Sequence, residues 1–334
     1  MEFIRNTCYT EAGGVEMIIK QRERPAKIAG YEALLARLPA KHPKREYILD
    51  LLYSANAGIG GEERLDECLE YFDPPYPYVM IHDLSLPEKC QIDTLLITQS
   101  SITVLEVKNM SGKLCLKTNP SVLHQTLPSG QVKSYKSPVI QAETAKIKVE
   151  KILKRHACPL NVKTAIVLAY PSQMIENVPP GATVWSADEV MYRLYRMEEP
   201  KPLISIGQMN SLGELLLSID RSHKPFPLAP NLKINPNEIE NGVFCPRCRL
   251  RKMKRQIQRW HCPTCNFYSR DEYLRALDQW FMLYKSTINA KECMQFLGLR
   301  DTGSARRMLK SKGLEEMGGR RHRYYQLKRN HQWQ

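Results

Sequence analysis

The 334-residue sequence lacks any apolar run of the about 18 residues that a membrane-spanning helix requires. It also lacks the basic start, apolar stretch and small-residue cleavage site of a secretory signal, because its first twenty residues are polar and broken by Gly13-Gly14. Internal repeats and low-complexity tracts are missing too. These absences predict a globular cytoplasmic protein with reduced thiols and no membrane partner.

Positive charge is concentrated at the C-terminal end of the sequence. The formal net charge is +14, and residues 245–334 hold 21 Lys and Arg against 7 Asp and Glu, so this part carries the whole excess. Such an excess can be plain solvated surface. Here it coincides with a cysteine motif and helical patterns, which predicts a module that faces nucleic acid.

Four of the ten cysteines form two C-x2-C pairs, Cys245-Pro-Arg-Cys248 and Cys262-Pro-Thr-Cys265. Four thiolates complete the tetrahedral coordination of Zn²⁺ and leave no open position, so the spacing predicts a structural zinc ribbon. His261 is expected on the surface instead of among the ligands. The six scattered cysteines are expected to be small buried hydrophobic residues, namely Cys8, Cys68, Cys90, Cys115, Cys158 and Cys293.

Hydrophobic periodicity predicts a mixed α/β core between helical segments. A helical hairpin is expected over 28–53 and a further helix over 62–72, followed by short β-branched strands and then a long helix. The strands are expected at 78–84, 91–98, 101–107, 112–116 and 163–169, and the long helix at 138–155. The expected division is a helical lead-in (1–54), a core domain (55–220), a proline-rich linker (221–241), a zinc ribbon (242–268) and a basic domain (269–334).

The basic domain shows three helical signals, over 271–285, 289–297 and 301–313, before Gly318-Gly319 and two strand-like runs. A Gly-Gly pair between such runs favours a two-residue hairpin turn. This pattern resembles a winged helix-turn-helix domain in which the third helix reads DNA and the hairpin is the wing. A small helical bundle with a basic face is the alternative.

The most informative pattern is an acidic pair beside a lysine. Side chains on a strand alternate between faces, so Glu106 and Lys108 share one face. If Gln99-Ser100 is the turn, the register sets Asp93 directly opposite Glu106, with Cβ atoms about 4.5 to 5.5 Å apart. A register shifted by one residue would place Asp93 on the other face. The favoured register predicts a cluster of these three side chains at one edge of the sheet.

Two carboxylates at such a distance repel each other unless a cation joins them, so a divalent metal is the expected partner. Mg²⁺ or Mn²⁺ held by Asp93 and Glu106 would meet substrate oxygens, and Lys108 could orient a water and stabilise charge on phosphorus. Such a site hydrolyses phosphodiesters. The alternative is a surface ion pair in which the two acids flank Lys108.

At this point the sequence resembles the nuclease-related (NERD) domain, which belongs with the PD-(D/E)xK restriction-endonuclease-like folds. The resemblance covers roughly residues 55–170 and rests on ordered motifs. These are Gly58-Ile-Gly-Gly-Glu62, His82-Asp83, Gln91-Ile-Asp93, Leu105-Glu106-Val-Lys108-Asn109, Gly112 and Ser137-Pro138-Val-Ile-Gln141. The helical hairpin before Gly58 also resembles the lead-in of bacterial members. Ser137 departs from the Asn that the family often has, at a position that is not a ligand.

The resemblance implies a mixed sheet flanked by helices and adds two residues to the catalytic set of Asp93, Glu106 and Lys108. Glu62 matches a helix-borne acid that supplements the metal site, and Gln141 matches a helical glutamine near water or phosphate. Without the resemblance, Glu62 would be a first-turn acid favoured by the helix dipole, and Gln141 an ordinary exposed helix residue.

Basic residues between the cysteine pairs and in the last domain are the predicted contacts to nucleic acid. They are Arg249, Arg251, Lys252, Lys254, Arg255, Arg306, Arg307, Lys310, Arg320, Arg321 and Arg323, with Lys312 also expected to face DNA. Trp260 either stacks on a base or packs in the ribbon core.

The sequence therefore predicts a metal-dependent nuclease acting on DNA, brought to it by the basic C-terminal region. Two alternatives stay open: a non-catalytic or regulatory DNA-binding protein that retains the fold, and an RNA-directed protein. The complete set of Asp93, Glu106 and Lys108 favours the enzyme. A homo-oligomer is compatible with the sequence, which sets no oligomeric state.

Overall fold

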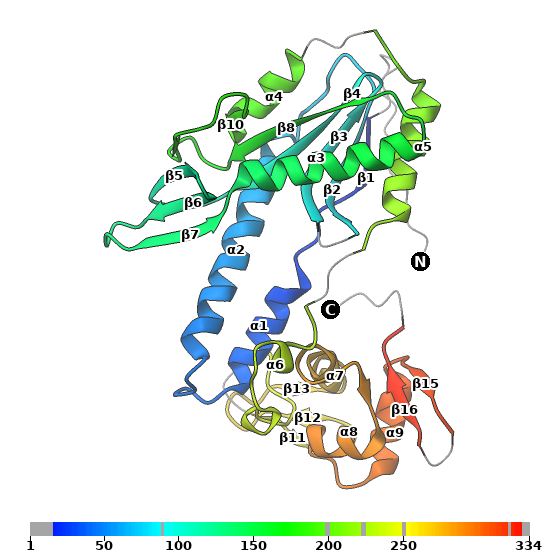
Figure 1. Cartoon of the computed structure of the whole chain (residues 1–334). Coiled ribbons are helices and arrows are strands. Elements are labelled where there is room, and N and C mark those ends of the chain that lie inside the picture. The colour runs from blue at the N-terminus through cyan, green and yellow to red at the C-terminus, as the bar shows by residue number, and fades with distance from the viewer. Residues whose placement is uncertain are drawn as a thin grey trace. The chain divides into compact units, whose positions relative to one another are not determined.

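The computed structural model describes residues 16–87, 90–197, 201–221, 225–248, 252–319 and 322–328, with the side chains of residues 16 and 17 left out. Their contacts divide the chain into two compact units (Figure 1). Unit 1 comprises the described residues of Met1–Arg24 and Asn56–His223, and unit 2 those of Pro25–Ala55 and Lys224–Gln334. In the described parts, no helix is both long and apolar enough to cross a membrane.

Unit 1 is built on one mixed sheet with the strand order β1-β2-β3-β4-β8-β10. The β2–β3 and β3–β4 pairs are antiparallel, whereas β1–β2, β4–β8 and β8–β10 are parallel. The strands are β1 (Glu16–Lys20), β2 (Tyr78–Leu86), β3 (Cys90–Thr98), β4 (Ser101–Lys108), β8 (Asn161–Leu168) and β10 (Val184–Ser186).

Helices cover both faces of this sheet because alternate strand residues are apolar on each face. Val79 and Ile81 pack with residues of α3 (Pro138–Arg155) and α5 (Ile206–Ser218). The other face, with Met80, packs with residues of α2 (Arg45–Cys68) and α4 (Ala187–Tyr195). The predicted class, a mixed α/β sheet flanked by helices, is confirmed.

A second sheet, of order β7-β6-β5-β9, extends unit 1 after β4. Sequence patterns predicted its first strand at 112–116, and the rest of the sheet was not predicted. Its strands are β5 (Lys113–Thr118), β6 (Ser121–Thr126), β7 (Val132–Lys136) and β9 (Ile175–Glu176).

One helix replaces the second arm of the hairpin predicted over 28–53 and the helix predicted over 62–72. Helix α2 runs from Arg45 to Cys68 straight through the glycines of the Gly58–Glu62 motif. Glycine costs a helix about 1 kcal/mol, which is why the sequence suggested a break. At Gly61, however, an added Cβ would lie 2.5 Å from the Cβ of Asn109, so the glycine permits close packing against the residue after β4. The predicted boundary at residue 54 falls inside this helix.

Unit 2 contains the predicted three-helix pattern at its C-terminal end. Helix α8 is capped by Asn289, and α9 by Asp301. The elements are α7 (Glu272–Leu283), β14 (Thr287–Ile288), α8 (Ala290–Leu297), α9 (Thr302–Ser311), β15 (Glu315–Met317) and β16 (Tyr324–Gln326). The sheet order β14-β16-β15 adds a strand from between the first two helices.

The predicted two-residue turn at Gly318-Gly319 is wrong. Met317 pairs with Tyr324, so the connection between β15 and β16 is longer than the glycine pair. Gly318 has φ +79 and an added Cβ would lie 2.4 Å from the carbonyl oxygen of His322. Gly318 therefore allows a tight backbone contact inside a longer loop between β15 and β16. A Gly-Gly dipeptide alone does not predict the length of that loop.

The ribbon and the C-terminal helices α7 to α9 share one hydrophobic core, although the sequence suggested separate domains. Short strands β11 (Lys254–Arg255), β12 (Trp260–His261) and β13 (Tyr268–Ser269) form the ribbon sheet. Trp260 is 1% exposed and packs with Trp280 and Phe281 of α7. The core interpretation of Trp260 is therefore confirmed.

The predicted linker 221–241 is packed structure in its described part. Leu228, Ile234 and Ile239 are buried with residues of α1 (Ala26–Arg37) and α7. The short helices α6 (Leu228–Asn231) and η1 (Pro236–Glu238) lie in this segment. Its prolines favour local turns, which suggested a linker. The apolar residues between these prolines pack into the core, and the proline content does not reveal this.

Arg37 ties the N-terminal helices of unit 2 to the ribbon. Its side chain is 1% exposed, and its guanidinium donates to Gln279 Oε1 at 2.7 Å, Glu240 O at 2.8 Å and Gly242 O at 3.0 Å. The rings of Phe244 and Phe296 each lie 4.8 Å from it. Residues 25–55, predicted as part of a lead-in to the core domain, thus belong to unit 2.

Candidate functional site

The predicted register of the β3–β4 hairpin is confirmed. Thr94 pairs with Leu105 and Ile97 with Ile102, the register that places Asp93 opposite Glu106. Asp93 lies just beyond the last of these pairs, and its Oδ2 accepts a hydrogen bond of 2.8 Å from the backbone N–H of Val107. The carboxylate of β3 is thereby fixed against the strand that carries the other candidate residues.

Glu106 and Lys108 share one face of β4, as predicted. Glu106 is 4% exposed, and Lys108 Nζ pairs with its Oε1. Burial, followed by the neighbouring Asp93, raises the pKa of Glu106 to about 7 in spite of Lys108. Burial also raises the pKa of Asp93, against the pull of Lys108 and the Val107 N–H. Burial alone would lower the pKa of Lys108, but the two acids raise it, so this lysine stays cationic.

Glu62 reaches the same region from helix α2. It lies mid-helix, so the alternative of a first-turn acid is wrong. The close packing of Gly61 on Asn109 positions it, and Asn109 Nδ2 also donates to Ala57 O at 2.9 Å. Glu62 contributes to the raised pKa of Lys108, after Glu106 and Asp93.

Gln141 stands in the first turn of α3, where its backbone N–H bonds to Ser137 O at 3.0 Å. Its side chain is half-buried and makes no hydrogen bond to other residues in the described chain. The structure therefore places Gln141 on the expected helix without joining it to the acidic residues.

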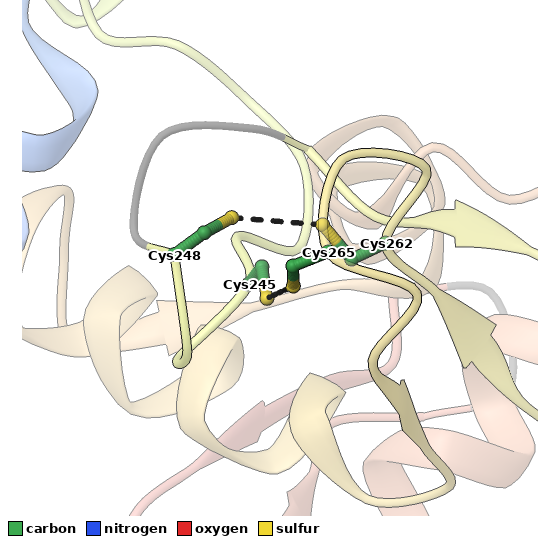
Figure 2. Close-up of side chains that lie close together, drawn as sticks. All are labelled: Cys245, Cys248, Cys262 and Cys265. Carbon is green, nitrogen blue, oxygen red and sulfur yellow. Dashed lines mark hydrogen bonds between the residues drawn. The ribbon is translucent and has the colours of Figure 1, made fainter.

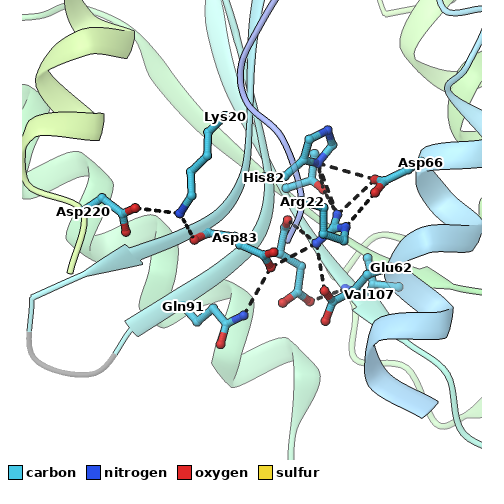
Figure 3. A network of polar contacts seen from close by, with 11 residues as sticks. Lys20, Arg22, Glu62, Asp66, His82, Asp83, Gln91, Val107 and Asp220 are labelled. Carbon is cyan, nitrogen blue, oxygen red and sulfur yellow. Dashed lines mark hydrogen bonds and ion pairs between the residues drawn. The ribbon is translucent and has the colours of Figure 1, made fainter. Parts of the chain in front are cut away.

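Arg22, which sequence analysis missed, is the central cation of a polar network (Figure 3). It follows β1, and its side chain is only 5% exposed. Its guanidinium meets Asp66 Oδ2 at 2.7 Å, Glu62 Oε2 at 2.8 Å and Asp83 Oδ1 at 3.1 Å. The charged run Gln21–Arg24 resembles a solvated segment, so no sequence signal marks this burial.

His82 and Asp83, both in the resemblance motifs, complete this network. Arg22 Nη2 lies 3.2 Å from His82 Nδ1 and 3.0 Å from Thr94 Oγ1. Burial lowers the pKa of His82, an effect that Asp66 opposes and Arg22 reinforces. Asp83 has φ 52, a left-handed conformation inside β2, and its carboxylate lies near both Arg22 and Gln91. Such conformations cost about 1 to 3 kcal/mol and cluster at functional sites.

The donor set suits one divalent cation. Carboxylates outnumber cations in the described cluster, where the acids are Glu62, Asp66, Asp83, Asp93 and Glu106 and the cations are Arg22 and Lys108. When all five acids are ionised and His82 is neutral, three negative charges remain in excess. In the described residues the acids do not form a ready group of three ligand atoms. Mg²⁺ needs only one or two carboxylates together with water and substrate oxygens, so Asp93 and Glu106 fit it.

Comparison with known families agrees with this geometry. Residues 57–169 match the family described as the nuclease-related domain, NERD. This segment is therefore similar to NERD domains. It contains Glu62, Asp93, Glu106, Lys108 and Gln141, whereas Arg22 lies outside the matched residues. The search of curated proteins and the search of solved structures found no match to the chain.

A four-cysteine cluster lies outside the segment that matches the NERD family, in the ribbon (Figure 2). Sγ of Cys245 lies 3.5 Å from that of Cys265, and Sγ of Cys248 lies 3.6 Å from that of Cys262. All four sulfur atoms lie within 4.8 Å of one another, an arrangement that can hold a metal ion. A tetrahedral Zn²⁺ with Zn–S bonds of about 2.3 Å separates its sulfurs by about 3.8 Å. The separations are thus those of metal ligands and far exceed a disulfide bond.

Backbone N–H groups support the same cluster. Those of Arg247 and Cys248 donate toward Cys245, and those of Thr264 and Cys265 toward Cys262. Such donors favour thiolates and lower the pKa of Cys262 to about 6, whereas burial outweighs them at Cys245 and raises its pKa to about 12. His261 instead stacks on Tyr268, with ring centroids 4.5 Å apart, and is not in the cluster, as expected. Of the scattered cysteines, Cys90 and Cys293 are buried as predicted, Cys68, Cys115 and Cys158 are half-buried, and Cys8 lies outside the described residues.

The predicted nucleic-acid contacts of unit 2 are exposed in most described cases. Exposed side chains are those of Lys252, Lys254, Arg255, Arg306, Arg307 and Lys310. Lys252 pairs with Glu240 at 3.1 Å, and Arg255 lies over the Trp260 ring at 5.3 Å. Arg323 is half-buried and pairs with Glu316 across the hairpin at 2.8 Å. Arg249, Arg251, Arg320 and Arg321 lie outside the described residues.

Lys312 does not face solvent, so its predicted contact with DNA is wrong. Its side chain is 7% exposed, and its Nζ lies 2.6 Å from Asp278 Oδ2 in helix α7, which is 2% exposed. The lysine follows the last turn of α9, where the chain folds back on the core. Burial of Asp278 requires a charged partner, and Lys312 supplies it.

A cleft of about 830 Å³ opens between the ribbon and the α8–α9 turn within unit 2. Lys254 and Arg255 line one side, and Arg300 and Ser304 line the other. Trp260 also contributes to the lining. The cleft thus brings the basic residues of the ribbon beside the start of α9.

Proposed function

We propose that this protein is a metal-dependent nuclease that hydrolyses phosphodiester bonds in DNA. The observation that carries the proposal is the buried pair of Asp93 and Glu106 beside Lys108 at the end of the β3–β4 hairpin. Burial raises both carboxyl pKa values, and the neighbouring Asp93 raises that of Glu106 further, which is the electrostatic signature of a site that favours an added cation. The NERD domain supports a nuclease-related role.

Asp93 and Glu106 would hold Mg²⁺ or Mn²⁺, which when bound would supply positive charge beside the scissile phosphate. Lys108 stays cationic between the acids and can orient the attacking water while it stabilises charge on the phosphate oxygens. The Val107 N–H holds Asp93 in place. Hydrolysis joins the hydroxide of that water to phosphorus, breaks one P–O ester bond and gives the proton to the departing oxygen.

Unit 2 would bring the enzyme to DNA. Arg306, Arg307 and Lys310 form an exposed basic stripe on α9, the helix that lies in the major groove in winged-helix complexes. Lys254 and Arg255 would add phosphate contacts from the ribbon. RNA binding uses similar charges, so substrate comparison decides between the two nucleic acids.

The cysteine cluster would hold structural Zn²⁺. Its four sulfur atoms match the spacing of a tetrahedral ion, and four thiolates leave no open position for substrate. Soft thiolates favour zinc, whereas the carboxylates of unit 1 favour Mg²⁺ or Mn²⁺. The two sites therefore differ in metal and in role.

The test is cleavage of labelled duplex, single-stranded and branched DNA, and of RNA, by the purified full chain with and without Mg²⁺ or Mn²⁺. We expect metal-dependent cleavage of DNA that Asp93→Asn and Lys108→Ala abolish. Glu150→Gln and Lys151→Ala, exposed residues of α3, are the matched controls and should cleave normally. Metal-independent cleavage, or cleavage that survives Asp93→Asn, would refute the proposed site.

A non-catalytic DNA-binding protein is the second candidate. It is favoured by the direct Lys108–Glu106 ion pair, because Lys108 balances part of the negative charge of the site without a metal ion. Binding of DNA without cleavage under every metal condition, together with unchanged affinity in Lys108→Ala, would support this function over the enzyme.

A further inference from the structure

The polar network of unit 1 contains a second cation position that is already filled. Arg22 inserts its guanidinium among Glu62, Asp66 and Asp83, with N–O distances of 2.7 to 3.1 Å. The same group reaches His82 Nδ1 and Thr94 Oγ1. With its side chain 5% exposed, Arg22 is a fixed interior charge and not a surface ion pair.

The acids of this network fall into two sets with different partners. Glu62, Asp66 and Asp83 are each paired with Arg22 through their carboxylates. Asp93 and Glu106 are instead held by the Val107 N–H and by Lys108. Arg22 meets Asp93 only at its main-chain carbonyl oxygen, at 3.2 Å.

This division bears on how many metal ions the site can take. Two-metal phosphodiesterases hold their ions about 3.5 to 4 Å apart, which requires carboxylates on both sides of the reacting phosphate. Here the three acids of the second set already share one cation, the Arg22 guanidinium, which stays protonated at any ordinary pH. A second divalent ion would have to displace Arg22 from these carboxylates and leave its buried charge without an anionic partner, which is strongly unfavourable.

We propose that Arg22 is a positioning residue that takes the place of a second metal ion. It restricts the site to one divalent cation, held by Asp93 and Glu106, and fixes the β3 backbone at Asp93 through the carbonyl. Glu62 then serves as a partner of Arg22 and not as a metal ligand. This inference rests on the proposed nuclease function, because it concerns the same metal site.

The first test counts Mn²⁺ bound to the zinc-loaded full chain, by electron paramagnetic resonance titration. We expect one Mn²⁺ per chain, lost in Asp93→Asn and Glu106→Gln and kept in Asp66→Asn with an affinity changed by less than about threefold. Two Mn²⁺ per chain, one of them lost in Asp66→Asn, would overturn this inference and leave the nuclease proposal standing. No bound Mn²⁺ in the wild-type chain would overturn both.

The second test changes the arginine itself. Arg22→Lys keeps one positive charge but cannot reach all the acceptors, so Mn²⁺ should still bind once, with affinity reduced about tenfold by the loosened Asp93. Arg22→Met leaves three acids without their cation, and a second Mn²⁺ should bind there. Arg64→Met, which removes a surface arginine paired with Glu67 and Asp188, is the matched control and should change neither count nor affinity.

If Arg22→Met does not fold, which near-ultraviolet circular dichroism would reveal, the Asp66→Asn count decides the question alone. A folded Arg22→Met that still binds a single Mn²⁺ with wild-type affinity would overturn the inference. The metal count separates this role from a purely structural one, because a general loosening of the fold weakens binding without creating a second site.

Discussion

The backbone N–H of Val107 donates to Asp93 Oδ2 at 2.8 Å, so a single hydrogen bond joins the acid of β3 to the strand that carries Glu106 and Lys108. The regular β3–β4 pairs end one residue earlier, at Thr94 and Leu105. The Asp93 side chain thus links β3 to β4 one residue beyond their last regular backbone pair. Asp93 therefore accepts a structural hydrogen bond and also carries the negative charge proposed to bind the metal. A mutation can remove the charge and keep the hydrogen-bond acceptor.

Asp93→Asn should keep the fold and lose the chemistry. The amide oxygen of Asn still accepts a hydrogen bond from the Val107 N–H. The variant lacks the negative charge with which Asp93 would bind the metal ion. We expect an unchanged circular dichroism spectrum, no measurable Mn²⁺ binding and a loss of cleavage of more than about a hundredfold. Asp93→Ala should, in addition, lower the melting temperature. Equal destabilisation by both variants would contradict this assignment.

The raised pKa of Glu106 predicts a specific dependence of the free energy of unfolding on pH. This pKa is raised from 4.5 to about 7, mainly by burial. Between these values the folded chain keeps a proton that the unfolded chain has lost, so the free energy of unfolding falls as pH rises, by up to about 3 kcal/mol. Below about pH 4.5 and above about pH 7 this contribution stays constant.

Glu106→Gln removes that titration. Relative to the wild-type chain, the variant should therefore gain stability as pH rises from 5 to 8, when both are melted in buffer freed of Mg²⁺ and Mn²⁺. Saturating Mn²⁺ should raise the wild-type melting temperature at pH 8, because the metal favours the ionised carboxyl. A stability difference that does not vary with pH would show that Glu106 is ionised throughout.

Much of this site could be predicted from sequence because its determinants are local. Strand alternation and a two-residue turn place Asp93, Glu106 and Lys108 together, and their register is the one predicted. Arg22 could not be predicted, since its burial depends on β1 joining the sheet beside β2, some sixty residues away in sequence. The unbroken helix α2 was missed for a similar reason: the packing of Gly61 on Asn109 is a tertiary contact that helix propensity does not contain.

Loss of the cysteine-bound metal should destabilise all of unit 2. Cys245 and Cys262 belong to the same core as Trp280 and Phe281, so the ribbon cannot open alone. We expect Cys248→Ser and Cys262→Ser to release zinc, whose binding supplies on the order of 10 kcal/mol of folding free energy in such sites. Protease should then cut after residue 224, while Mn²⁺ binding to unit 1 persists.

The control for that experiment is Cys68→Ser, which changes a half-buried cysteine of unit 1 and should leave zinc content unchanged. Metal analysis of the wild-type chain is expected to give one zinc per molecule. A zinc-free chain that still resists protease over residues 252–319 would show that the core alone holds the ribbon.

Arg37→Met should weaken unit 2 without touching its surface charge. The variant leaves Gln279 Oε1, Glu240 O and Gly242 O without their buried donor, at a cost of about 3 kcal/mol or more. Denaturant unfolding followed by tryptophan fluorescence measures the loss. Arg37→Lys should recover part of it, and Arg270→Met, an exposed arginine of the same unit, should cost little. Equal effects of the two methionine variants would contradict the buried role.

The basic stripe of α9 should set the salt dependence of DNA binding. Each phosphate that is neutralised contributes about −0.9 to the slope of log affinity against log salt. Replacing Arg306, Arg307 and Lys310 with Ala should therefore flatten the slope by about 2 to 3 and weaken binding at low salt. The fold should remain intact because all three side chains are exposed.

Lys312 is the discriminating control, since it is a lysine of the same segment whose charge faces inward. Lys312→Ala removes the cation that pairs with the buried Asp278, so unit 2 should lose about 3 kcal/mol or more of stability, whereas the salt slope of the folded fraction should not change. Lys312→Met should behave alike. If Lys312 instead altered the slope as much as Arg306 does, phosphate contacts would extend to the core-facing side of α9, and DNA would bind unit 2 on a different face from the one proposed.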